Sequence, residues 1–189
     1  LLSRGLGDVY KRQGGVAGND TLYSMVSGTK GMNVIAPTWF SMTDENGAFR
    51  SFATAGYVTT AHQMGLQVWG VLDNFNYANE NGISISTLNM LSSTTARQNL
   101  VKNVTDTAVG LGLDGINVDF EQLSSDCGPH YVEFLRELSI ECRNKGLVLS
   151  IDNYVPFNFN DYYRLDIQGE VADYVIIMGS VSYTHLTLP

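Results

Sequence analysis

The 189-residue chain carries 11 Lys and Arg against 19 Asp and Glu, a formal net charge of −8, and 44% of its residues are hydrophobic. An acidic chain without a basic stripe does not fit a nucleic-acid-binding protein, so no nucleic-acid partner is expected. The apolar content suits one packed core, but no run of about 18 apolar residues predicts a membrane span, and Cys127 and Cys142 are too few for a disulfide scaffold.

The two terminal stretches, residues 1–13 and 181–189, depart from the pattern of their neighbours. Both resemble translated sequencing-adaptor sequence, and we expect them to be non-native tails on a genuine segment over 14–180. A disordered basic N-terminus and a frayed C-terminal strand are the alternative.

Strands and helices are predicted to alternate along this segment. Apolar runs that end in polar or aromatic residues predict strands over 32–40 and 67–74. Between them a helix is predicted over 57–64, with Gly65 as its end. A second helix is predicted from residue 96, where apolar residues follow helical spacing as far as Gly110.

The next segment, from Leu113 to Glu121, is the most informative in the chain. Apolar residues alternate with Asn117, Asp119 and Glu121, which is the period of a β-strand. The three polar side chains therefore share one face. Because a buried carboxylate without a partner is costly, they must meet each other, solvent or a ligand. An edge strand with a solvated face is the alternative.

The pattern of alternation continues to residue 178. Gly128 and Pro129 predict the start of a helix that ends at Gly146, with Cys142 on its apolar face. Strands are predicted over 147–152 and 173–178. Alternating strands and helices favour a parallel sheet with right-handed crossovers, of which five strands are visible.

The row Asp114-Gly-Ile-Asn117-Val-Asp119-Phe-Glu121 resembles the Asp-Gly-x-Asp-x-Asp-x-Glu signature of glycoside hydrolase family 18, the chitinase-like family. Asn117 stands where many members carry the middle Asp. The resemblance implies an α/β fold, the (β/α)8 TIM barrel, with its active site at the C-terminal ends of the strands. Because a closed barrel has eight strands, we expect a partial barrel over 14–180.

The resemblance also implies roles for the signature residues. Glu121 is expected to act as acid and then as base, and Asp119 to orient the substrate's 2-acetamido group. Asn117 is expected to hydrogen-bond Asp119, and Asp114, which is out of phase with the row, to tie down the start of the strand. Substrate-binding residues are expected at the ends of other strands, with core packing as the alternative for any single aromatic: Trp39, Asp73, Asn74, Tyr154 and Met178.

The predicted function is hydrolysis of a polysaccharide that contains N-acetylglucosamine, by the substrate-assisted retaining mechanism that the resemblance implies. The stretches 33–40, 68–74 and 114–121 are most similar to a bacterial branch of spore cortex-fragment lytic enzymes and cell-wall N-acetylglucosaminidases. This branch places peptidoglycan ahead of chitin and the parent protein outside the cytoplasm. No cofactor or metal is expected, since no His or Cys has a partner at metal-ligand spacing.

Three alternatives stay open. The family usually continues as Met-x-Tyr-Asp, but Gly179 and Ser180 follow Met178 here, which favours an inactive truncated chain. A non-catalytic glycan-binding member of the same fold is the second alternative. The third is an unrelated α/β protein whose row of Asn117, Asp119 and Glu121 binds a hard cation.

Overall fold

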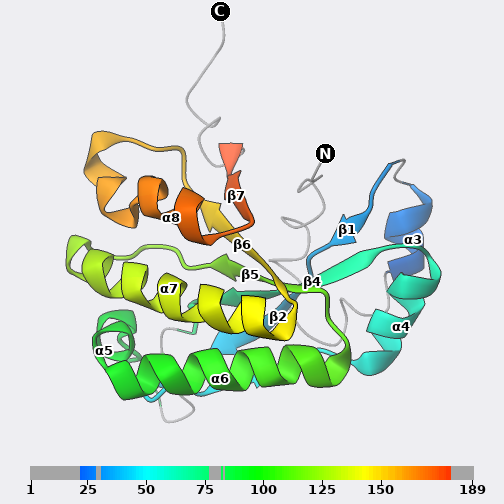
Figure 1. Ribbon diagram of the computed structural model, residues 1–189, viewed down its shortest axis with the longest axis horizontal. Helices are drawn as coiled ribbons and strands as arrows, with labels where there is room; N and C mark the ends of the chain where they lie inside the picture. Colours follow the sequence, from blue (N-terminus) through cyan, green and yellow to red (C-terminus); the bar gives the residue numbers. More distant parts are fainter. Residues whose placement is uncertain (1–21, 29–30, 77–81, 83, 180–189) are drawn as a thin grey trace, which may run out of the picture.

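The computed structural model describes residues 22–28, 31–76, 82 and 84–179. The predicted tails at 1–13 and 181–189 lie outside these residues. Within them, a sheet carries helices across one face, and α6 and α7 lie side by side on it (Figure 1). None of the helices in this part of the chain is long and apolar enough to cross a membrane.

Seven strands form the sheet in the described residues. The order is β3-β2-β4-β5-β6-β7, with β1 beside β4, and every pair is parallel except the β2–β3 hairpin. The strands are β1 (Val34–Ile35), β2 (Thr38–Met42), β3 (Phe49–Ser51), β4 (Gln67–Asp73), β5 (Gly115–Asp119), β6 (Val148–Asn153) and β7 (Tyr174–Ile177).

The helices begin and end at residues whose chemistry explains the boundary. The Ser93 hydroxyl accepts from the Ala96 N–H and caps α6, while Gly112 and Gly146 end α6 and α7 with φ of 76° and 69°, the left-handed region that favours glycine. The helices are α3 (Leu22–Ser27), α4 (Ala55–Gln63), α5 (Thr87–Ser92), α6 (Thr94–Leu111), α7 (Gly128–Lys145) and α8 (Leu165–Val171), with 3₁₀ turns η2 (Ser125–Cys127) and η3 (Asn158–Tyr163).

The strand order confirms the predicted fold class. From β4 to β7 each strand pairs in parallel with the next strand of the chain. Right-handed crossovers between such neighbours place all the helices on one face, and a right-handed twist then curls the sheet into an arc of a barrel. The α/β partial barrel expected from the sequence is therefore the observed architecture.

The two faces of β5 meet different surroundings, as its alternation predicts. Ile116, Val118 and Phe120 belong to the core beneath the helices, and the ring of Phe120 stacks on Phe134 of α7 at 5.3 Å between centroids. Burying each such side chain contributes about 1.5–3 kcal/mol. The opposite face, which carries Asn117 and Asp119, is turned away from α7.

The structure differs from the sequence prediction at the N-terminal strand. The strand expected over 32–40 is two strands, β1 and β2, separated at Ala36 and Pro37. Proline has no N–H to give to a sheet, and here its carbonyl alone joins the ladder, by accepting from Val71 at 2.9 Å. The hairpin strand β3 and the short helices α3, α5 and α8 were not predicted, because elements of three to seven residues carry too little periodic signal.

Candidate active site

Acidic side chains gather at the C-terminal ends of the central strands. In the β4–β5 register Asp73 lies directly opposite Asp119, and Ser41 of β2 lies opposite Asp73. One step beyond the Val118–Ile151 pair, Asp152 continues the row on β6. The three aspartates are at most 3% exposed. Parallel strands in register thus bring carboxylates from three βα units to one edge, where barrel enzymes place their active sites.

The Asp73 carboxylate is fixed within this row. Its Oδ1 accepts from the Ser41 hydroxyl and from the backbone N–H of Phe75 at 3.1 Å. Asn117 lies two residues before Asp119 on the same face of β5. Its Nδ2 donates to Ser150 Oγ at 2.8 Å. The structure shows this bond to Ser150, and the bond to Asp119 that the sequence predicts stays a prediction.

Glu121 follows β5 directly and is held at its main chain by Asn74. The Asn74 Oδ1 accepts from the Glu121 N–H at 2.9 Å, and the Asn74 Nδ2 donates to the Glu121 carbonyl at 3.0 Å. The same Nδ2 also donates to Thr87 Oγ1 of α5 at 3.2 Å. This amide therefore positions Glu121, and its expected contact with substrate stays a prediction.

Tyr154 holds the Glu121 side chain. Its hydroxyl donates to Glu121 Oε2 at 2.9 Å and accepts from the Gln122 N–H at 3.3 Å. Burial, together with this bond to a carboxylate, raises the pKa of Tyr154, so the phenol stays protonated and remains a donor near neutral pH. Tyr154 therefore contacts the side chain of Glu121, the candidate acid, directly.

The chain turns sharply after Glu121. Gln122 has φ of 54°, a left-handed conformation that costs a non-glycine residue roughly 1–2 kcal/mol. Two further tyrosines secure this turn, since Leu123 donates to the Tyr163 hydroxyl at 3.2 Å and the Tyr162 hydroxyl donates to the Leu123 carbonyl at 2.7 Å. Sequence reasoning missed both residues, and the adjacent pair Tyr162-Tyr163 in the segment that follows the strand predicted over 147–152 was the available signal.

Asp114 lies apart from this group, at the opposite end of β5. Its Oδ2 accepts from the Val68 N–H at 2.7 Å and contacts His62 Nε2 at 2.8 Å. Seven residues of extended chain separate it from Glu121 by roughly 20 Å. Asp114 therefore ties β5 to β4 and α4, the role expected from its phase, and the structure corrects its grouping with the catalytic residues.

Trp39 and Met178 are also buried. The Trp39 ring is 2% exposed and packs edge-to-face on Tyr57 of α4 at 4.9 Å, so it lies in the core and not on an open sugar-binding surface. Met178 is 4% exposed, and its N–H donates to the Asn153 carbonyl at 2.7 Å. Of the expected substrate-binding residues, Asp73 and Tyr154 lie with Asp119 and Glu121.

A pocket of about 240 Å³ opens beside Glu121. It is lined by residues of the loop after β5 and of the segment after β6, and these include Gln122 and Tyr154. No group of three or more His, Cys, Asp or Glu in the described part of the chain is arranged to hold a metal ion.

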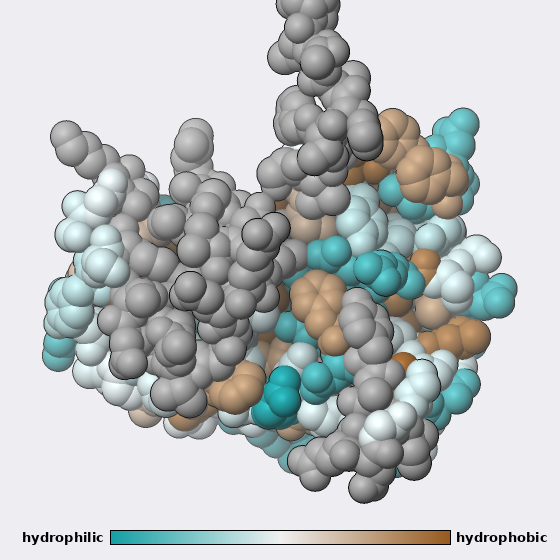
Figure 2. Space-filling model, turned by 180° about the vertical axis from the view of Figure 1, so that it is seen from behind, coloured by the Kyte–Doolittle hydropathy of each residue, from teal (hydrophilic) through white to brown (hydrophobic). Residues whose placement is uncertain are grey.

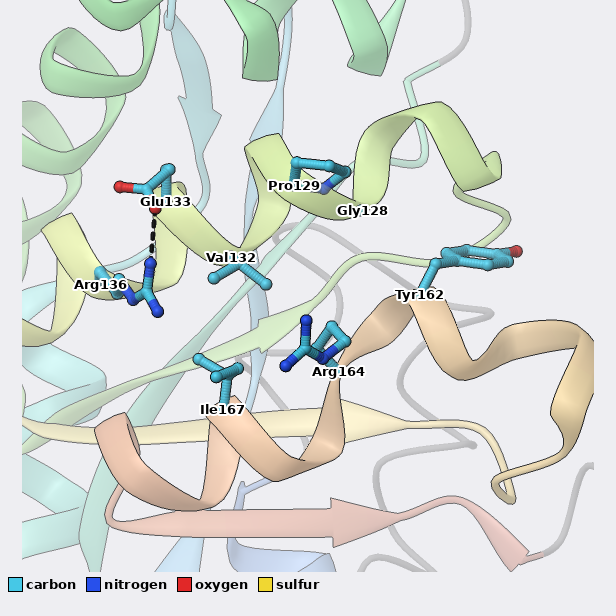
Figure 3. Close-up of a pocket in the computed structure, with 8 residues that line it drawn as sticks. All are labelled: Gly128, Pro129, Val132, Glu133, Arg136, Tyr162, Arg164 and Ile167. Carbon is cyan, nitrogen blue, oxygen red and sulfur yellow. Dashed lines mark hydrogen bonds and ion pairs between the residues drawn. The ribbon is translucent and has the colours of Figure 1, made fainter.

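A second pocket, of about 430 Å³, lies between α7 and the η3–α8 segment (Figure 3). Its charged residues are already paired: Arg136 with Glu133, and Arg164 with Asp166, each at 2.7 Å. It contains none of the signature residues. The lining residues are Gly128, Pro129, Val132, Glu133, Arg136, Tyr162, Arg164 and Ile167.

The chain is similar to proteins of known sequence and structure. It is 34% identical over 97 residues to the provisionally named sporulation-specific glycosylase YdhD of Bacillus subtilis, across 48% of this chain and 22% of that protein. The crystal structure of YdhD superposes with a TM-score of 0.67 and 25% identity, over 77% of this chain and 49% of the other. No protein-family model matches the chain.

Two further solved structures share the fold. The spore cortex-lytic enzyme SleL of Bacillus cereus has a TM-score of 0.65 and 25% identity, over 77% of this chain and 34% of that one. A chitinase of Chromobacterium violaceum has a TM-score of 0.64 and 24% identity, over 77% and 48%. The chain spans half or less of the length of these relatives. Its sequence thus resembles that of the glycosylase YdhD, and its fold resembles those of YdhD, SleL and the chitinase, consistent with the chitinase-like family that the signature strand predicts.

Proposed function

We propose that this protein is a glycosidase that cleaves a glycan containing N-acetylglucosamine, with Glu121 as its acid and base. The main support is that Glu121 is held at two points. Asn74 hydrogen-bonds its main chain and Tyr154 hydrogen-bonds its carboxylate, at the strand ends beside Asp119. A general acid must be held within hydrogen-bond reach of the atom that it protonates. The relatives' names, glycosylase and chitinase, support the same class of reaction.

The proposed mechanism is substrate-assisted. Glu121 donates its proton to the glycosidic oxygen as the bond to the anomeric carbon breaks, and the substrate's own acetamido oxygen bonds to that carbon. Asp119 stabilises the resulting positive oxazolinium ring. The Glu121 carboxylate then takes a proton from water, which attacks the anomeric carbon, opens the ring and leaves the configuration retained.

The proposed substrate is peptidoglycan ahead of chitin. The names of YdhD and SleL refer to sporulation and to lysis of the spore cortex, and both share 25% identity with this chain across 77% of its length. Comparing release of reducing sugar from purified peptidoglycan and from chitin tests this preference.

A fluorogenic N-acetylglucosamine oligomer tests the reaction. Replacing Glu121 by Gln keeps its size and removes its acidity, so we expect the rate to fall by at least about 100-fold. Glu133→Gln on α7, an equal change at a half-exposed position, is the matched control and should keep the wild-type rate. Equal rates for wild type and Glu121→Gln would contradict the proposal.

A glycan-binding protein without hydrolytic activity is the second candidate. It is favoured by Gly179 and Ser180 after Met178, where the family carries a tyrosine for the acetamido group. Binding of the oligomer by wild type without measurable hydrolysis would support it.

A further inference from the structure

Two phenylalanines near Glu121 are exposed in a way that large apolar residues usually are not. Phe157 is 52% exposed and Phe159 76% exposed, and their rings stack at 5.4 Å with only 10° between their planes. Figure 2 shows hydrophobic side chains gathered at the upper right, the corner where the segment between β6 and α8 lies. Leaving such rings in water forgoes about 1.5–3 kcal/mol each, and exposed patches of this kind mark binding sites.

The backbone beneath this pair is fixed. The buried Asn160 side chain accepts from the Phe157 N–H at 2.7 Å and donates to the Val155 carbonyl at 3.1 Å. One side chain therefore closes the loop from 155 to 160 at both ends. A platform that is already ordered saves the entropy that a ligand would otherwise have to offset.

The pair shares its pocket with the Glu121 site. Phe157 and Phe159 line the same 240 Å³ pocket as Tyr154. The Tyr154 hydroxyl is 2.9 Å from Glu121 Oε2, so the carboxylate stands at the edge of this pocket. The volume lies below the ~300 Å³ at which sites for whole small ligands begin, and it suits a single ring of a longer chain.

The chemistry of the lining suits a sugar ring. None of the side chains that line the pocket is charged, and aromatic faces lie beside hydroxyl and amide groups. A pyranose has an apolar face of C–H groups, which packs on an aromatic ring, and a rim of hydroxyls, which hydrogen-bonds to groups such as Gln122 and Tyr154. Recognition by stacking and neutral hydrogen bonds is insensitive to salt, unlike recognition by charge.

We propose that Phe157 and Phe159 form a sugar-binding platform that holds one ring of the glycan beside Glu121. The proposal rests on the function proposed above, because that function places the glycan at Glu121. Gln122, which follows Glu121, and Tyr154, which hydrogen-bonds the Glu121 carboxylate, line the same pocket as the two phenylalanines. Asp119, which the proposed function assigns to the ring being attacked, does not line this pocket, so the platform holds a different ring.

Binding of the N-acetylglucosamine tetramer, measured calorimetrically in a Glu121→Gln background, tests the platform without turnover. We expect F157A/F159A to raise Kd about tenfold, since two aromatic contacts of ~0.5–1.5 kcal/mol each are lost. F157L/F159L should weaken binding equally, because leucine is apolar but offers no flat face. Tyr23→Ala, which removes a ring that is 67% exposed on α3, should leave Kd unchanged.

The outcomes separate the two proposals. A Kd for F157A/F159A within about twofold of its parent would overturn the platform, as would the absence of any binding. Retention of affinity by the leucine pair would also overturn it, because the flat aromatic faces would then not be what holds the sugar. Phenylalanine-dependent binding in a chain that hydrolyses nothing would support the platform and refute the proposed hydrolysis. Circular dichroism should be unchanged in every variant, because both rings lie at the surface.

Discussion

The side chain of Asn74 and the main chain of Glu121 form a reciprocal pair of hydrogen bonds, at 2.9 and 3.0 Å, that joins the ends of β4 and β5. An amide matches a peptide group in this way because it offers one acceptor and one donor. The position of Glu121 is therefore set by the neighbouring strand as much as by its own.

Asn74→Ala should destabilise the protein and slow catalysis together. It leaves the Glu121 N–H and carbonyl without their partner, at about 1–3 kcal/mol, and frees the acid from its position. Urea unfolding and kcat measure the two effects. Asn103→Ala, at an exposed position of α6, is the control and should change stability by less than about 0.5 kcal/mol. A fully active Asn74→Ala would show that Glu121 needs no such support.

Tyr154→Phe should lower kcat with little change in KM. The ring remains in place, but Glu121 Oε2 loses a hydrogen-bond donor worth about 0.5–1.5 kcal/mol. Since the raised pKa keeps the Tyr154 phenol protonated throughout the neutral range and above it, ionisation of Tyr154 itself should add no pH dependence to the loss near neutral pH. A loss of rate that appears only on one side of neutrality would contradict a simple positioning role.

Asp114→Ala should lower stability without lowering kcat, whereas Glu121→Gln should do the reverse. The Val68 N–H loses its partner, and the free energy of unfolding should fall by about 1–3 kcal/mol, whereas kcat of the remaining folded enzyme should stay the same. Glu121→Gln should remove activity and leave stability intact. A loss of kcat in fully folded Asp114→Ala would return this residue to the catalytic group.

Two glycines should respond oppositely to alanine. A Cβ at Gly115 would lie 2.7 Å from the Val148 carbonyl oxygen and 2.9 Å from Trp69 Cδ1, so Gly115→Ala should cost about 1–3 kcal/mol. A Cβ at Gly110, inside α6, meets nothing within 4 Å. Gly110→Ala should therefore stabilise the helix by about 0.5–1 kcal/mol. Thermal melts of both variants check the contrast, and equal shifts would refute it.

The sequence predicted those parts of the fold that local chemistry determines. Alternation along 113–121 predicts one polar and one apolar face, and the glycines at 112 and 146 mark helix ends by their conformational freedom. Asp119 and Glu121 could be named because their spacing on one strand is itself the signal. The main parallel strands follow from apolar runs of five or more residues.

The contacts between strands were beyond the reach of these patterns. Glu121 is held by Asn74, which follows β4, and by Tyr154, which follows β6. These contacts depend on the register between strands, which no single strand specifies. Trp39 illustrates this dependence. The register of β2 against β4 shifts between Thr38 and Phe40, and such a bulge re-aims the side chains beside it. A ring expected at the cleft lies instead in the core.

The order of the strands bears on how the chain acquires its structure. From β4 onward every new strand pairs with the one that precedes it by a single helix-containing connection. Each pairing closes a loop of modest length, so its entropic cost is small and no strand must wait for a distant partner. Emerging from a ribosome, the chain can add one βα unit at a time to an existing edge, and the carboxylates of Asp73, Asp119 and Asp152 come together in the order in which they are synthesised.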